Sequence, residues 1–301
     1  MQDGPHARAH RTRHTAHGVH AQGAWTRGHL HGDDTMSTVS DLSQLMTIMR
    51  YEMLKFLRGK KLYIMLGLIA VIAVAIMIIP PALGEAYPNA DEFIQFFAQF
   101  ANILVILIVT LFGADSIVYD FEKGTAFVLY PNPVRRRTIF VGKFLSAFLV
   151  SAGVLAAYYM LAAVLDFGIN QAVPLETVWS LLLAIGYMFT LMSVTFLIST
   201  TMKSTLAASV IVFALFFLVF SMVEGVLTVV GQEPFFVITS MSTVIQDIMV
   251  TPFPETVKQD FGAFQVLIYH PTVRTALLVF AGYAIPSLAL AYNRFLKKEL
   301  Q

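Results

Sequence analysis

Long uninterrupted apolar stretches dominate the chain and set its fold class. A membrane-spanning helix needs about 20 mostly apolar residues, because the hydrocarbon core is about 30 Å thick and a helix rises about 1.5 Å per residue. Runs of this length without alternating polar residues exclude a β-barrel. We therefore predict an all-α polytopic membrane protein with six transmembrane helices. The six segments contain no charged residue and lie at Leu62–Leu83, Phe93–Ala114, Phe144–Leu165, Val178–Ser199, Thr205–Val223 and Thr275–Asn293.

A different pattern precedes the first span, in residues 42–60. Its apolar residues recur at helical spacing and fall on one face, with basic and polar residues outside that face. This pattern predicts an amphipathic helix in the inner headgroup layer, followed by a break at Gly59. The alternative is an amphipathic helix that packs on a soluble domain. The apolar face comprises Leu42, Leu45, Met46, Met49, Met53, Phe56 and Leu57.

The segment between the second and third spans is long and carries both acidic and basic residues. No proline interrupts the chain from Phe93 to Tyr130, so we expect the second helix to continue past the membrane surface, with Gly113 as a bending point. Pro131 and Pro133 then end it, since proline lacks an amide hydrogen and clashes with the preceding turn. A short helix held below the bilayer is suited to docking another protein. The alternative is that the arginines at 135–137 only anchor the third span at anionic headgroups.

Residues 225–274 contain apolar stretches that are too short to cross a membrane. We predict that Phe235–Met241, Thr243–Val250 and Ala263–Tyr269 form short re-entrant or interfacial helices over the outer mouth of the bundle.

Composition and the placement of charge agree with a membrane protein of defined orientation. Hydrophobic residues make up 57% of the chain and charged residues 13%, about half the charge of a soluble domain. Of the lysines and arginines after residue 35, fourteen lie in segments on one side of the predicted spans and two, Lys258 and Arg274, lie on the other. Because basic residues are retained inside, both termini are predicted to be cytoplasmic in a multi-pass plasma-membrane protein.

The first 35 residues differ from the rest. They hold seven of the eight histidines and no apolar run that resembles a signal peptide. We interpret residues 1–35 as a disordered tail or as upstream sequence before a true start at Met36. A metal-binding tail is the alternative, since His-rich tracts bind transition metals, although the spacing matches no defined ligand set.

Several function classes lack the residues they need. The chain has no cysteine and no phosphate-binding loop, and no span contains a histidine for an intramembrane protease. No catalytic, cofactor or metal site and no nucleic-acid partner is therefore predicted. Ion-coupled carriers usually place ionisable residues within their spans, and here such residues occur only at the span ends. An uncoupled pore or a membrane scaffold remains open.

Polar residues in or near the spans are candidates for a substrate path. Gln99 and Asn102 lie three residues apart in the second span, and Glu224 lies at the outer end of the fifth. All three have structural alternatives, namely hydrogen bonds to neighbouring helices for the amides and a position at the headgroups for the carboxylate. Gly153 and Ala157 have the spacing of a close-packed helix interface, as in helix dimers, although small pairs at this spacing are common by chance.

The amphipathic helix, the sequence Glu122-Lys123-Gly124-Thr125 with its following Tyr130-Pro-Asn-Pro-Val-Arg135 turn, and the re-entry at Gly142-Lys143 together resemble the permease subunits of ABC-2 type transporters. The resemblance covers about Leu42 to Leu300. It implies a helical-bundle exporter with an N-terminal elbow helix over residues 42–60 and a permease domain over residues 62–300.

The resemblance also implies a cytoplasmic coupling helix that contains Glu122, Lys123, Gly124 and Thr125 and that contacts a separate ATP-binding-cassette ATPase, with Tyr130 and Arg135 near its end. A second permease copy or a sister permease, and membrane lipids, are the other implied partners. The substrate is not encoded in these motifs.

Overall fold

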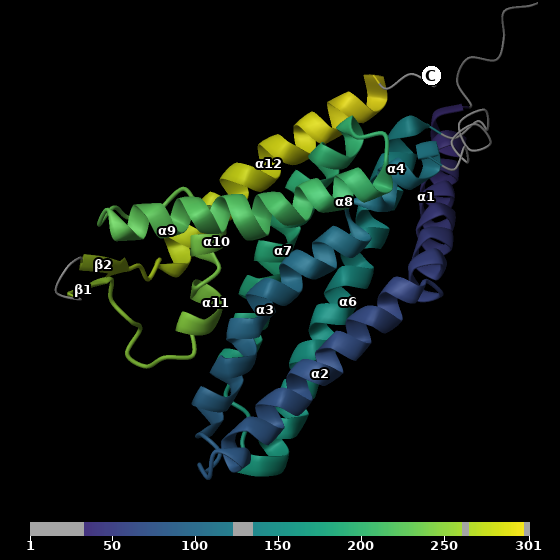
Figure 1. Ribbon diagram of the computed structural model, residues 1–301. Helices are drawn as coiled ribbons and strands as arrows, with labels where there is room; N and C mark the ends of the chain where they lie inside the picture. The colour runs from purple at the N-terminus through teal and green to yellow at the C-terminus, as the bar shows by residue number, and fades with distance from the viewer. Residues whose placement is uncertain (1–32, 123–134, 261–264, 298–301) are drawn as a thin grey trace, which may run out of the picture.

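The computed structural model describes residues 33–122, 135–260 and 265–297, and helices make up most of it (Figure 1). The predicted residues Lys123, Gly124, Thr125 and Tyr130 lie outside this part of the chain, as do residues 1–32. The longer helices are α1 (Asp33–Leu57), α2 (Lys60–Ala82), α3 (Ala90–Phe112), α6 (Arg136–Asn170), α7 (Glu176–Thr201) and α12 (Val273–Lys297). The shorter elements are α4 (Asp115–Glu122), α8 (Thr205–Phe213), the π-helical segment η1 (Ala214–Phe220), α9 (Ser221–Val229), α10 (Ile238–Met241), α11 (Val244–Asp247), β1 (Val257–Asp260) and β2 (Gln265–Ile268).

Six helical segments of the described chain are long and apolar enough to cross a membrane, which confirms the predicted fold class. Each segment contains its predicted span, except that the first ends at Ala82, one residue before the predicted end. The largest difference is in α6, which has 35 residues and begins eight residues before the predicted span. A helix of that length measures about 52 Å at 1.5 Å per residue, more than the hydrocarbon core, so α6 extends beyond it.

The second span bends where the sequence predicts. Helix α3 ends at Phe112 with Gly113 as its C-cap, and α4 begins at Asp115. A Cβ atom on Gly113 would lie 2.5 Å from the Met192 sulfur of α7 and 2.7 Å from the Val109 carbonyl oxygen. Glycine is therefore required here because α3 and α7 approach closely at the bend.

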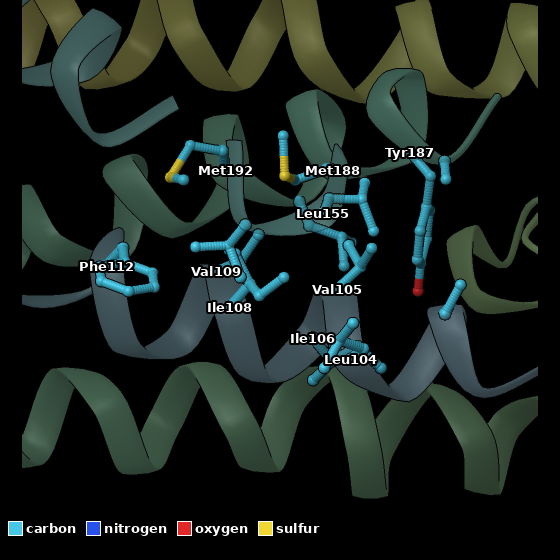
Figure 2. Close-up of a cluster of buried hydrophobic side chains, with 14 of the residues drawn as sticks. Leu104, Val105, Ile106, Ile108, Val109, Phe112, Leu155, Tyr187, Met188 and Met192 are labelled. Atoms are coloured by element: carbon cyan, nitrogen blue, oxygen red, sulfur yellow. The ribbon is translucent and has the colours of Figure 1, made fainter. Parts of the chain in front are cut away.

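Helices α3, α6, α7 and α12 form the centre of the bundle. Figure 2 shows apolar side chains of α3, including Val105 and Val109, facing Leu155 of α6 and Met188 and Met192 of α7. In the most apolar 18-residue stretch of the second span, 61% of the residues are buried inside the protein. The corresponding share is 17% for both the first and the fifth span. Helix α2 and the α8–η1–α9 span therefore lie at the periphery and expose apolar side chains.

Helix α1 packs along the start of α6, at the end of the bundle where α4 and the end of α12 also lie (Figure 1). We call this end of the bundle the basic end; Lys55, Lys61, Lys143 and Arg294 lie in the helix ends that meet there. A Cβ on Gly142 would lie 2.7 Å from Cγ2 of Ile48, so the two helices are in close contact. Of the predicted apolar face, Phe56 is buried whereas Leu42, Met46 and Leu57 are exposed. Helix α1 thus packs against α6 on one side and exposes apolar side chains on another. It begins at Asp33, so residues 33–35 of the predicted disordered tail are helical, a correction of that boundary.

The region between α9 and α12 is only partly as predicted. Helix α10 forms the last four residues of the first predicted stretch, and α11 forms four residues near the start of the second; both are buried against the bundle. The prediction of a helix at Ala263–Tyr269 is wrong for residues 265–268, which form β2 and pair antiparallel with β1. Val266 and Ile268 are β-branched and favour a strand, and the β1 strand supplies a backbone partner that the sequence pattern did not reveal.

Candidate functional site

Three helices meet in a charged network at the basic end. The Nζ atom of Lys143 on α6 lies 2.5 Å from Oδ2 of Asp120 on α4 and also bonds Oε1 of Glu52 on α1. Only 1% of the Lys143 side chain is exposed. A buried ammonium group is costly unless carboxylates and hydrogen bonds compensate for its lost hydration. The network therefore binds α1, α4 and α6 to one another through a single buried charge.

Lys55 of α1 completes this network from its more exposed side. Its Nζ lies 3.3 Å from Oε2 of Glu52 and 4.0 Å from Oδ1 of Asp120. The same ammonium group lies 4.4 Å from the ring centroid of Tyr119 on α4, within the range of a cation–π contact. Two lysines thus balance two carboxylates, and both lysines contact α4. We call Glu52, Lys55, Asp120 and Lys143 the junction network.

A second ion pair fixes the bend between α3 and α4. Lys61, in the first turn of α2, lies 2.6 Å from Oδ2 of Asp115 and donates to the carbonyl oxygen of Leu111 at 3.1 Å. Asp115 begins α4, and Leu111 is in the last turn of α3. Lys61 therefore satisfies a carbonyl that the helix end leaves free and ties the first span to the bend.

Glu122 is the one predicted coupling residue of the 122–125 motif that the structure describes. Its Oε2 accepts hydrogen bonds from the backbone amide of Thr205 at 2.7 Å and from the Thr205 hydroxyl at 2.6 Å. Thr205 begins α8, so the carboxylate satisfies an otherwise free amide at the positive end of the helix dipole. Arg135 is exposed and precedes the first residue of α6. The two described residues that flank segment 123–134, Glu122 and Arg135, thus lie next to elements that reach the spans.

The candidate substrate-path residues have different surroundings. Asn102 accepts a hydrogen bond from the Tyr187 hydroxyl of α7 at 2.9 Å through its Oδ1 atom, so it serves a contact between helices. Glu224 of α9 accepts one from Thr239 of α10 at 3.0 Å. Gln99 is exposed and lines a groove between α2 and α3. Two of the three residues therefore hold elements together, and one faces open space.

An acidic residue that sequence analysis did not single out, Asp247 of α11, pairs with His270 outside the spans. The two side chains approach to 3.0 Å between Oδ2 and Nδ1, and the His270 amide donates to the Thr256 hydroxyl. Burial raises the pKa of Asp247 above its ordinary range, although the hydrogen bond and charge of His270 oppose this. The pair ties α11 to the chain just before α12. In the sequence, the one sign of this pair is that His270 lies far from the other seven histidines.

The part of the chain that the structure describes contains no group of three or more His, Asp or Glu side chains placed to hold a metal ion. Sequence analysis also missed the junction network. Lys143 belongs to the Gly142-Lys143 re-entry, but its partner Glu52 lies 91 positions earlier, and no local pattern marks that pairing.

Comparison with known proteins adds one assignment. A family model described as ABC-2 family transporter protein matches residues 46–300, which is most of the chain. A search of curated proteins found no match.

Proposed function

The chain belongs to the ABC-2 family of transporter proteins, and we propose that it is the permease subunit of an exporter driven by a separate ATPase. Both termini face the cytoplasm in this proposal, so the basic end is the inner end, in the cytoplasmic membrane. The placement of lysine and arginine supports this orientation. The permease works as a pair, either with a second copy of itself or with a sister permease, because two ATPase chains close on each other around ATP.

The observation that carries the proposal is the junction network. Helix α4 leads directly into segment 123–134, which corresponds by sequence to the coupling helix of the family. Asp120 lies near the end of α4 and is bonded to the buried Lys143 of α6 and paired with Lys55 of α1. If α4 moves with the coupling segment, α6 and α1 must follow or a buried ion pair breaks, which is costly.

Glu122 provides a second connection from the same segment. Its two hydrogen bonds to Thr205 lead to α8 and hence to the fifth span. In the proposed mechanism, ATP binding closes the ATPase pair and moves the coupling segment. The movement passes to α6 and α1 through Asp120 and to α8 through Glu122. The spans then rearrange between arrangements that are open to the two sides of the membrane.

Charge reversal of the coupling segment tests this function. We expect that replacing Lys123, Gly124 and Thr125 with glutamates removes the ATPase from the purified complex or abolishes the ATPase activity that depends on the permease. Replacing the exposed Lys203 with glutamate is the control, because it reverses one charge in another loop at the basic end and leaves residues 123–125 unchanged. A triple variant that retains an intact and active complex would contradict the assignment of residues 123–125 as the ATPase contact.

A further inference from the structure

A groove lies between α2 and α3 at the end of the bundle opposite the basic end, where the two helices are joined (Figure 1). Its volume is about 600 Å³, within the range of small-molecule sites. Ile76 and Ile79 of α2 form one wall, and Phe93, Phe96 and Phe100 of α3 form the other. The groove is therefore an apolar space with aromatic rings on one side.

The turn between the two helices gives the groove a defined rim. The hydroxyl of Tyr87 donates a hydrogen bond to the carbonyl oxygen of Met77 on α2, at 2.9 Å. This bond folds the turn back against the end of α2. Glu85 in the turn and Glu92 in the first turn of α3 then both line the groove. Its acidic rim is thus a feature of the folded turn and not of a free loop.

Charge and depth together define what the groove can accept. None of the described residues that line it is basic, so Glu85 and Glu92 have no cationic side chain within the groove. The distance along α3 from Glu92 to Phe100 is about 12 Å at 1.5 Å per residue, so the apolar wall extends well below the carboxylates. Phe96 and Phe100 are exposed and can present ring faces to a cation. Gln99 adds a polar amide to the same wall.

We propose that this groove binds a lipophilic organic cation, with its positive charge near Glu85 and Glu92 and its apolar body against Phe96 and Phe100. An anionic ligand would be repelled by the two carboxylates, and a neutral acyl chain would gain no attraction from them. The proposal deepens the permease function and rests on it in one respect: such a cation is the class of substrate that the exporter releases at its outer end. It also gives Gln99 a place on the substrate path.

Tetraphenylphosphonium and tetraphenylborate test the proposal because they share size and shape and carry opposite charge. Binding is measured by equilibrium dialysis against the purified full chain in a nonionic detergent. We expect the cation to bind the wild-type chain and the anion to bind at least about tenfold more weakly. The double variant Glu85→Gln/Glu92→Gln should lose about tenfold in affinity for the cation, whereas Glu255→Gln, at an exposed site outside the groove, should bind like wild type.

A second variant distinguishes the effect of the groove's shape from the effect of its charge. Ala75→Phe places a ring in the groove without altering either carboxylate, so cation binding should fall although the charge is unchanged. Equal binding of both ions, or unchanged cation binding in either the double glutamine variant or Ala75→Phe, would overturn the proposal. The assay needs no ATPase, so its failure leaves the permease assignment standing, and failure to recover an ATPase leaves the groove assignment standing.

Discussion

At the scale of single residues, the most consequential finding is a lysine that has almost no contact with solvent. Lys143 is 1% exposed and is held by carboxylates of two other helices. Removing one member of such a network leaves the others buried and uncompensated, which is more damaging than removing the whole network. The junction network therefore makes three helices depend on one another.

Replacing Lys143 with methionine should destabilise the protein by about 3 kcal/mol, because Glu52 and Asp120 would remain close together with Lys55 as their one charge partner in the network. Thermal denaturation of the purified chain in detergent measures this. The triple variant Lys143→Met/Glu52→Gln/Asp120→Asn should recover most of the loss, since no buried charge is left. Lys203→Met, at an exposed position, should melt like wild type. A Lys143→Met protein with wild-type stability would show that the network does not hold the helices together.

At the scale of residues, the sequence indicated the type of contact that a polar side chain makes but not its partner. Asn102 forms a hydrogen bond between helices, the use that polar residues in spans most often have. The partners of Lys143 lie 23 and 91 positions away and become neighbours only through packing of α1, α4 and α6. Sequence spacing has no signature for such a contact. The coupling role of Glu122 stays a prediction, to which the structure adds its hydrogen bonds to Thr205.

At the scale of elements, helix boundaries followed from hydrophobicity and from chain-breaking residues. The spans are long apolar runs, and Gly59 and Gly113 interrupt the chain at predicted points, between α1 and α2 and between α3 and α4. Elements whose stability comes from pairing were harder to predict. Strand β2 is a short apolar run like the neighbouring segments that form α10 and α11, and only its register with β1 distinguishes it. The partial burial of α1 likewise depends on α6, which lies some ninety residues later.

The close contact between α1 and α6 predicts that a larger residue at Gly142 destabilises the protein. Gly142→Ala should destabilise the protein by about 1–3 kcal/mol, because the new Cβ would lie 2.7 Å from Cγ2 of Ile48. Gly282→Ala on α12 is the matched control, since a Cβ there meets no atom within 4 Å. Adding Ile48→Ala to Gly142→Ala removes the closest contact and leaves the Cβ of residue 48, at 3.2 Å, as the nearest atom, so it should restore part of the melting temperature. If Gly142→Ala and Gly282→Ala melt alike, the close packing of α1 on α6 is incorrect.

At the scale of the whole molecule, orientation is the prediction on which the functional assignment depends. The chain contains no cysteine, so single cysteines can be introduced without background. Val173→Cys, in the turn between α6 and α7, should react with a membrane-impermeant maleimide in intact cells. Lys203→Cys, in the loop between α7 and α8, should react only after the membrane is permeabilised. Both positions are exposed in the folded chain. The reverse pattern of labelling would place the basic end outside and contradict the proposed orientation.

The overall arrangement is compatible with the proposed partner proteins. The first and fifth spans are the least buried, which leaves apolar surface for lipid or for a second permease. In the proposed exporter, ATP binds to another protein, since this sequence has no phosphate-binding loop. The predicted fold class followed from composition and periodicity alone, but the identity of these partners did not, because neither leaves a pattern in the apolar positions of this chain.

The most direct test of the central claim is to purify the tagged chain from its native membranes in mild detergent and to identify the proteins that accompany it. The account predicts an ATPase with a phosphate-binding loop, recovered in amounts similar to the permease. It also predicts that this ATPase is lost from the variant with glutamates at Lys123, Gly124 and Thr125. Recovery of the chain alone, from membranes in which such ATPases are present, would contradict the assignment as an ATP-driven permease and favour an uncoupled pore or a scaffold.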